Sequence, residues 1–156
     1  MKTLLLAVAL VQFGSLDAPV TKGRQHVAYA SEAQTVTAGK RSELLLRFQI
    51  DRGFHVNSHT PKSDLLIPTR LELHESDGVK TGTTIYPAGS SLIQSAQSTQ
   101  PSETLDVYSD EFVLHVPVTA TPGPHELKGE LKYQACTGTA CFPARGLPVD
   151  IVFTAR

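Results

Sequence analysis

The two cysteines of the 156-residue chain, Cys136 and Cys141, lie close together in the segment YQACTGTACFP. Two neighbouring thiols can perform thiol–disulfide exchange, in which one thiolate attacks a partner's disulfide and the second cysteine then displaces the partner. On an extended strand their Cα atoms would be about 16 Å apart, whereas a disulfide requires about 4.4–6.8 Å. The residues between them must therefore turn back, and Gly138 is the one that best tolerates a positive φ.

A bridge of this kind could also serve only to brace a hairpin. Closing a loop of about six residues contributes roughly 2 kcal/mol by the chain-entropy estimate, against about 4.7 kcal/mol for a hundred-residue loop. A chain long enough to bury a substantial core has little need of so small a contribution. The energetics weaken the structural interpretation, but the residues alone leave both interpretations open.

The sequence neighbours of the cysteines include no Lys or His, and the nearest cations are Lys132 and Arg145. Because nearby positive charge favours the thiolate, we expect the thiols of the isolated domain to be only weakly activated. Tyr133 precedes the pair on the apolar side of a strand; we expect it in the core, with a role at the site as the alternative. Phe142 could offer an apolar contact to a docking protein or could simply pack.

The histidines offer a competing chemistry, because His55 and His59 have the spacing of two zinc ligands on one helical face. Gly53 and Pro61 flank them and argue against a helix. On a strand the two histidines would share a face, which we expect to be the solvated one. A site that combined them with the cysteines would make the protein a periplasmic metal-binding protein, and this remains an alternative.

The elements that must position these residues show an alternation of apolar and polar side chains. Weaker strand candidates cover 32–38, 66–75 and 79–87, and the polar stretch 88–106 is expected to be a long loop. We expect an all-β protein, an immunoglobulin-like antiparallel β-sandwich of about seven to nine strands, formed by one domain over residues 31–156. The apolar positions of the stronger strands are Leu44, Leu46, Phe48 and Ile50; Phe112, Leu114, Val116 and Val118; Leu127, Leu131 and Tyr133; and Val149, Ile151 and Phe153.

Charge and motifs exclude several classes of function. The net charge is −1, and the longest basic cluster is Lys40–Arg41, so nothing indicates nucleic-acid binding. The sequence contains no nucleophile elbow, no phosphate-binding loop and no evident pair of catalytic carboxylates. We therefore expect no small-molecule substrate, no metal and no cofactor other than a redox-active disulfide.

The N-terminus has the pattern of an export signal. One lysine precedes the apolar run Leu4–Phe13, which is too short to span a bilayer. We expect a signal peptide over residues 1–18, with Ala30 as the latest candidate cleavage point, and a buried N-terminal strand or helix as the alternative. Export to the periplasm or a similar oxidising compartment would permit a disulfide.

Longer segments resemble a known family: GFHVNSHTPKSDLLIPTRLEL, YPAG, EFVLHVPV and LKGELKYQACTGTACFPARGLPVDIVF. From about residue 30 to the C-terminus the chain resembles the N-terminal periplasmic domain of the bacterial thiol:disulfide interchange protein DsbD. The resemblance implies an immunoglobulin-like fold and a redox-active pair at Cys136 and Cys141. It favours exchange of the protein-disulfide reductase type over a structural bridge, with Cys141 as the attacking cysteine and Cys136 as the resolving one.

In full-length relatives this domain accepts electrons that cross the membrane and passes them to periplasmic disulfide proteins. The resemblance thus implies periplasmic disulfide or thioredoxin-like partners, and a place in processes such as cytochrome c biogenesis. A membrane electron carrier would act in trans, because the chain ends at Arg156 without membrane spans. In the family a loop caps the cysteines; the matching stretch falls in or near 102–112, with Tyr108 as a cap candidate and packing as its other role.

Two alternatives remain beside exchange. One is a non-catalytic immunoglobulin-like binding module whose disulfide braces a hairpin, and the other is the metal-binding protein described above.

Overall fold

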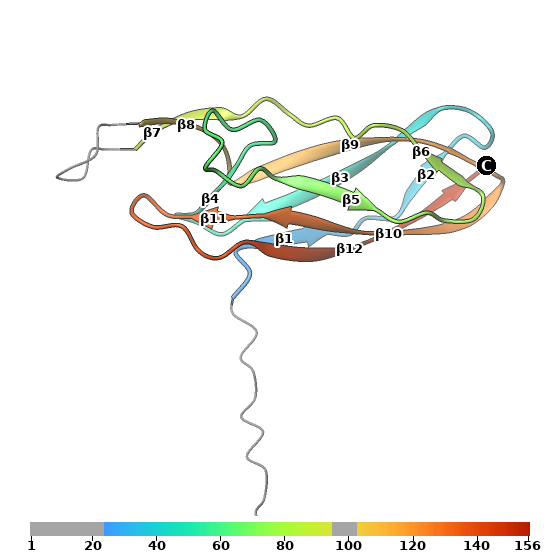
Figure 1. Cartoon of the computed structure of the whole chain (residues 1–156). Coiled ribbons are helices and arrows are strands. Elements are labelled where there is room, and N and C mark those ends of the chain that lie inside the picture. Colours follow the sequence, from blue (N-terminus) through green and yellow to red (C-terminus); the bar gives the residue numbers. More distant parts are fainter. Residues whose placement is uncertain (1–23, 95–102) are drawn as a thin grey trace, which may run out of the picture.

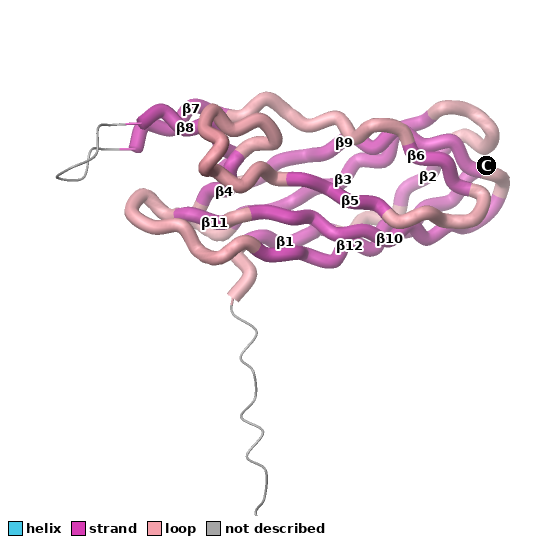
Figure 2. The backbone as a smooth tube through the Cα atoms, viewed as in Figure 1, coloured by secondary structure: helices cyan, strands magenta, loops and turns pink. Residues whose placement is uncertain are grey.

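The computed structural model describes residues 24–94 and 103–156, and there the chain consists of strands and connecting segments (Figure 2). No helix in these ranges is long and apolar enough to cross a membrane. The strands are β1 (Val27–Ala30), β2 (Gln34–Val36), β3 (Ser42–Ile50), β4 (His55–Asn57), β5 (Arg70–Leu73), β6 (Val79–Thr81), β7 (Ser90–Gln94), β8 (Glu103–Ser109), β9 (Glu111–Ala120), β10 (Gly123–Tyr133), β11 (Ala135–Cys136) and β12 (Arg145–Ala155).

Two four-stranded sheets form the body of the molecule, as the immunoglobulin-like sandwich requires (Figure 1). One has the order β1-β3-β9-β6 and the other β2-β12-β10-β5. The longest pairings, β3 with β9 and β10 with β12, are antiparallel, whereas β2 joins the edge of its sheet in parallel. These long ladders fix which side chains of each strand face inward, because successive residues point to opposite faces.

The core lies between the two sheets and follows the predicted alternation. The expected apolar positions of β3, β9, β10 and β12 are buried and belong to one cluster that contains residues of both sheets. Within it the rings of Phe48 and Phe112 stack with their centroids 5.0 Å apart. The prediction of an all-β sandwich is therefore confirmed.

A third sheet, of order β11-β4-β8-β7, lies at the end of the sandwich away from the C-terminus (Figure 1). β11 directly continues the direction of β10 after a one-residue break and pairs with β4. One face of this sheet joins the core through Val56, Tyr108 and Ala135. The other face carries the residues that alternate with them, and these include Cys136.

Twelve strands are present in the described residues, more than the seven to nine expected. The additional strands are short: β1, β4 and β11 have four, three and two residues, too few for an alternation pattern to reveal. The expected loop at 88–106 was partly wrong, because β7 and β8 pair as antiparallel strands there. Leu92 lies opposite Leu105, which is 5% exposed, and this apolar pair was hidden among polar residues.

The expected signal peptide at residues 1–18 lies outside the described residues. β1 pairs with β3 through Val27, which is opposite Ile50 and buried. Cleavage after Ala30 would remove this whole strand from its sheet.

Candidate functional site

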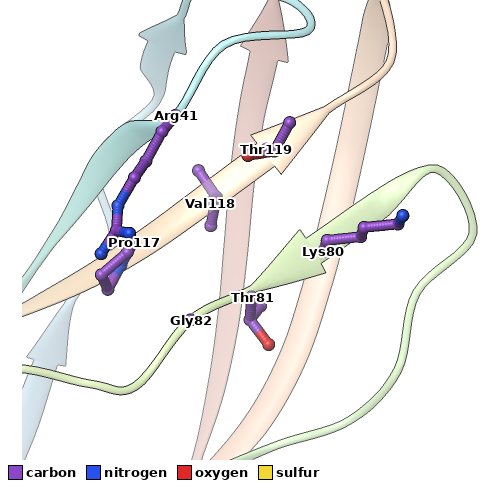
Figure 3. A pocket seen from close by; sticks show the side chains of 7 residues that line it. All are labelled: Arg41, Lys80, Thr81, Gly82, Pro117, Val118 and Thr119. Carbon is purple, nitrogen blue, oxygen red and sulfur yellow. The ribbon is translucent and has the colours of Figure 1, made fainter.

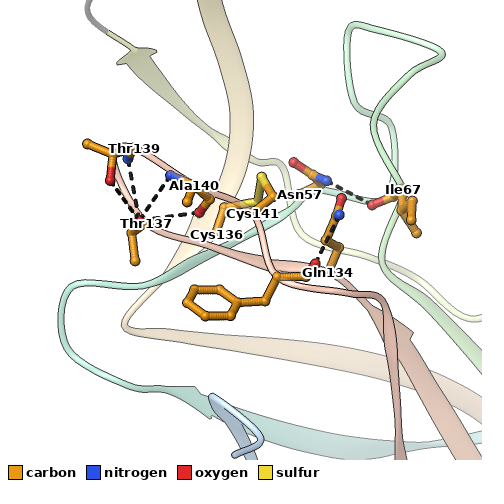
Figure 4. Close-up of a disulfide and its surroundings, with 9 residues drawn as sticks. Asn57, Ile67, Gln134, Cys136, Thr137, Thr139, Ala140 and Cys141 are labelled. Atoms are coloured by element: carbon orange, nitrogen blue, oxygen red, sulfur yellow. Dashed lines mark hydrogen bonds between the residues drawn. A yellow bond between two sulfur atoms is a disulfide. The ribbon is translucent and has the colours of Figure 1, made fainter. Parts of the chain in front are cut away.

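Cys136 and Cys141 face each other across a tight hairpin that follows β10, and a disulfide joins them (Figure 4). Their Cα atoms are 4.0 Å apart, so the segment between them turns back as its length required. Two hydrogen bonds close the base of the hairpin. The N–H of Phe142 donates to the carbonyl of Ala135 at 2.9 Å, and Nε2 of Gln134 donates to the carbonyl of Phe142 at 3.1 Å.

Thr137 organises the turn between the cysteines. Its N–H donates to the carbonyl of Ala140 at 2.8 Å, and its hydroxyl oxygen accepts from the N–H groups of Thr139 and Ala140 at 3.4 and 3.2 Å. The tolerance of Gly138 for a positive φ is not used in this turn, since the described glycines with positive φ are Gly39, Gly53, Gly78 and Gly123. The Thr137 hydroxyl bonds to nearby backbone groups and stabilises the turn, so no residue with a positive φ is needed here.

The two sulfur-bearing residues differ in their access to solvent. Cys136 is 2% exposed and lies in β11, which pairs with β4. Cys141 lies on the outer arm and is exposed. Of the two joined cysteines, Cys141 is therefore the one that faces solvent, while Cys136 is shielded.

The third sheet places His55 directly opposite Cys136 in the antiparallel register. Opposite residues of such a pair project their side chains from the same face, with Cβ atoms about 4.5–5.5 Å apart. His55 is 5% exposed, and its Nε2 has no hydrogen-bond partner. Burial lowers the pKa of the His55 imidazole below its ordinary value of 6.5, which favours the neutral ring.

One expectation about the histidines was therefore wrong, because His55 lies on a buried face rather than the solvated one. The register also places this histidine beside Cys136, although no histidine is near the cysteines in sequence. The sequence contained one weak indication that His55 could be buried. Successive residues of a strand point to opposite faces, so either His55 or Val56 had to face the core. The pairing of β4 with β11 could not be inferred, because both strands are too short to specify a register.

Asn57 lies on the same face of β4 as His55, two residues along the strand. It is fully buried, and Figure 4 draws it in the surroundings of the disulfide. Its Nδ2 donates to the carbonyl of Ile67 at 2.9 Å, whereas its Oδ1 has no partner. The hydroxyl of Thr69 in turn donates to the carbonyl of Asn57 at 2.6 Å, so the part of the segment that precedes β5 is tied back to the end of β4.

Phe142 follows the exposed cysteine and belongs to a small aromatic cluster. Its ring lies 5.3 Å from that of His26 and 5.7 Å from that of Phe54, measured between centroids. The rings of His26 and Phe54 stack at 3.7 Å, and Nδ1 of His26 lies 3.1 Å from a carboxylate oxygen of Asp51. Phe142 is still 39% exposed, so one part of its ring packs while the rest faces solvent beside Cys141.

The two tyrosines singled out from the sequence are both interior residues. Tyr133 is 1% exposed, and burial raises the pKa of its hydroxyl. Tyr108 is 4% exposed and lies on the core face of the third sheet, opposite to the face of Cys136. Its hydroxyl donates to the carbonyl of Pro87 at 3.0 Å and accepts from the N–H of His59 at 3.1 Å. The structure thus places Tyr108 in the packing role and not over the disulfide.

The structure does not bring the histidines and cysteines together as a ligand set. His59 stacks on Tyr86 with ring centroids 3.7 Å apart, and its Nδ1 lies 3.0 Å from the carbonyl oxygen of Thr69. Among the described residues, no group of three or more His, Cys, Asp or Glu side chains is arranged to hold a metal ion.

A shallow hollow of about 170 Å³ lies between β6, β9 and the segment that precedes β3 (Figure 3). Arg41 and Lys80 contribute two cations, and Pro117 and Val118 line its floor. β6 lies toward the C-terminal end of the sandwich, whereas β11 lies at the other end (Figure 1). This hollow is therefore remote from the disulfide and takes no part in its chemistry.

Comparison with solved structures supports the fold. The N-terminal periplasmic domain of ScsB from Proteus mirabilis matches with a TM-score of 0.51 and 14% identity, over 80% of this chain and 44% of that one. This chain thus spans less than half of the ScsB domain. The reduced N-terminal domain of Neisseria meningitidis DsbD matches with a TM-score of 0.47 and 18% identity, over 76% of this chain and 86% of that one.

A third match is the complex between the DsbD N-terminal and PilB N-terminal domains from Neisseria meningitidis, with a TM-score of 0.44 and 18% identity, over 69% of this chain and 73% of that one. No curated protein sequence matches the chain. The family described as the N-terminal domain of the thiol:disulfide interchange protein DsbD matches residues 24–151, which is most of the chain and includes the whole cysteine hairpin. The chain therefore belongs to the family of DsbD N-terminal domains.

Proposed function

We propose that this protein exchanges disulfides with protein partners through Cys136 and Cys141. The observation that carries the proposal is the unequal exposure of the pair in a member of this family, with Cys136 2% exposed and Cys141 open to solvent. A bridge that only braced a hairpin would need no such difference. An exposed cysteine backed by a buried one is an arrangement that suits exchange, because attack occurs at one sulfur while the other leaves.

In the oxidised domain, the thiolate of a partner attacks Sγ of Cys141. The bond between the two sulfurs of the domain breaks, and its electron pair goes to Sγ of Cys136, which leaves as a thiolate. A second partner thiolate then attacks the partner's own sulfur in the mixed disulfide and releases Cys141 as a thiolate. The two partner protons end on the two cysteines, so the domain is reduced as the partner is oxidised.

The reverse sequence reduces a partner's disulfide with the same atoms. The Cys141 thiolate attacks the partner, and Cys136 then attacks Sγ of Cys141 to release the partner as a dithiol. Cys141 is the cysteine that bonds to partners in both directions, and Cys136 is the resolving cysteine. The disulfide itself is the redox group, so the scheme requires no further cofactor.

The partners are proteins of the periplasm or a similar oxidising compartment, and they have dithiol or disulfide sites of the thioredoxin-like kind. One family member, the N-terminal domain of Neisseria meningitidis DsbD, forms a complex with the N-terminal domain of PilB. A membrane electron carrier would connect this domain to a source of electrons. Phe142, half in the aromatic cluster and half exposed, offers such a partner an apolar contact beside Cys141.

The reduction potential tests the proposal against a structural bridge. We expect the purified domain to equilibrate with glutathione buffers at a potential within the range of exchange proteins, about −120 to −270 mV. The fraction of reduced protein can be measured by thiol alkylation and mass spectrometry after acid quenching. A potential below about −300 mV, where structural disulfides lie, would instead support a hairpin brace.

A further inference from the structure

Two buried polar atoms beside the disulfide have no hydrogen-bond partner, Nε2 of His55 and Oδ1 of Asn57. Both side chains project from the face of β4 that also carries Cys136. Buried polar groups are normally satisfied, because leaving one unpaired costs free energy. Two such atoms next to a redox-active bond therefore call for a physical reason.

The chemistry of the disulfide supplies this reason. In the oxidised form neither sulfur carries a proton, and a disulfide sulfur is a weak acceptor. Reduction converts Cys136 into a thiol, which is a donor, and deprotonation converts it into a thiolate, which is a strong acceptor. The two polar side chains on this face of β4 thus lack a hydrogen-bond partner in the oxidised state, and they gain one when the disulfide is reduced.

We propose that His55 is the proton partner of Cys136: its imidazole binds the Cys136 thiol in the reduced domain and takes its proton when Cys136 attacks a mixed disulfide. This inference rests on the proposed exchange function and assigns a residue to its second step. His55 lies directly opposite Cys136 in the register, and the Cβ atoms of such a pair are typically about 4.5–5.5 Å apart. Asn57 completes the polar surroundings of the same cysteine and takes no proton.

The step balances in atoms and electrons. The Cys136 thiol gives its proton to the neutral imidazole and becomes a thiolate. This thiolate attacks Sγ of Cys141, the bond between Cys141 and the partner breaks, and the partner leaves as a thiolate. The imidazolium then returns its proton to the departing thiolate or to water. The products are the domain disulfide, a neutral imidazole and a partner thiol.

The groups around His55 are compatible with this role. On β11 it faces Cys136, and on β8 it faces Ser109, which is followed by the exposed carboxylate of Asp110. Asp106 and Tyr108 of β8 project from the other face of the sheet. Desolvation is the sole cause that lowers the pKa of His55. A neutral ring can accept a proton, and no charged partner holds it in another state.

The probe for this step is 5,5′-dithiobis(2-nitrobenzoate). The reduced wild-type domain should release one thionitrobenzoate when Cys141 attacks the reagent and a second when Cys136 resolves the mixed disulfide. For His55→Phe we expect an unchanged first phase, and a second phase slower by about 10²-fold at pH 7, the usual size of a proton-transfer contribution. His55→Gln keeps a hydrogen-bonding group but cannot take the proton, so its second phase should also be slow.

The equilibrium with glutathione separates the two variants. Loss of the partner of the reduced thiol should shift the equilibrium of His55→Phe toward the disulfide by about tenfold, or about 30 mV. His55→Gln should shift it less, because its amide can still pair with the thiol. The exposed His74 provides a matched control, since His74→Gln should match the wild type in both assays.

A third test uses the wild-type protein alone, so it does not depend on whether a variant folds. The ¹⁵N chemical shift of His55 Nε2 should change on reduction, while that of His74 stays constant. An unchanged His55 shift, or a second phase equal in His55→Phe and wild type, would overturn the role of His55. A wild type that shows no second phase at all would instead overturn the proposed exchange function, so the two failures are distinguishable.

Discussion

Cys136, Cys141 and His55 carry the redox account at the scale of single residues. The two cysteines were evident from the sequence, and so was their need to turn back on each other. Their unequal exposure and the placement of His55 opposite Cys136 were not evident. The spacing of residues along the chain shows only which residues share the cysteine turn. A neighbour across the sheet depends on the strand register, and strands of two or three residues are too short to reveal it.

The buried imidazole also makes a prediction about acid stability. The pKa of His55 is lowered in the folded state, so between that value and about 6.5 the unfolded chain binds a proton that the folded chain does not. This contribution to stability is complete above about pH 6.5 and is lost as the pH falls. We expect the free energy of unfolding in urea to decrease from pH 7.5 to pH 5 more in the wild type than in His55→Gln.

The same measurement on His74→Gln serves as the control, because His74 is exposed. Each unit by which the folded pKa lies below 6.5 corresponds to about 1.4 kcal/mol. Equal losses of stability in the wild type and in His55→Gln would show that the imidazole is not held neutral by burial.

Strand pairing positions the site at the scale of elements. β10 is clamped between β12 and β5 and delivers the cysteine hairpin to the end of the sandwich. The long strands were predictable because their alternation runs over nine or more residues. The hairpin β7–β8 was not, because its apolar pair lies in a stretch otherwise rich in polar residues.

A glycine in β10 tests how tightly this clamp is built. A Cβ added to Gly129 would lie 2.5 Å from the backbone oxygen of Glu72 and 2.9 Å from a methyl carbon of Leu73, both in β5. Gly129→Ala must therefore push β5 away, and we expect a loss of about 1–3 kcal/mol in the free energy of unfolding, measured by denaturant titration.

Gly138 in the cysteine turn provides the matched comparison. A Cβ there would meet no atom within 4 Å, and its φ is not positive. Gly138→Ala should stay within about 0.5 kcal/mol of the wild type, as ordinary surface changes do. Equal effects of the two substitutions would mean that β5 does not approach β10 as closely as described.

The whole molecule is stabilised by its sandwich core rather than by the disulfide. The core cluster contains residues of both sheets, and the described part of the chain holds one disulfide, which closes a loop within a single hairpin. The all-β class and the alternating core followed from composition and period-two patterns. The third sheet could not be predicted in this way. Its strands pair at one end of the sandwich, and they lack a clear alternation of apolar and polar residues.

Reduction should therefore leave the fold intact. By the chain-entropy estimate the short bridge contributes about 2 kcal/mol, which is a fraction of a domain's usual stability of 5–15 kcal/mol. We expect the reduced domain to keep its far-ultraviolet circular dichroism spectrum and to melt several degrees lower than the oxidised one. Global unfolding on reduction at 25 °C would show that the hairpin bridge is a structural requirement.

The most direct test of the redox assignment is the capture of mixed disulfides by single-cysteine variants. Cys136→Ser leaves the exposed Cys141 without its resolving partner, so it should accumulate covalent complexes with periplasmic proteins that reducing agents release. Cys141→Ser leaves only the buried Cys136 and should capture few or none, and the double variant none. Equal capture by both single variants, or capture by neither, would contradict the account in which Cys141 is the sulfur that meets the partner.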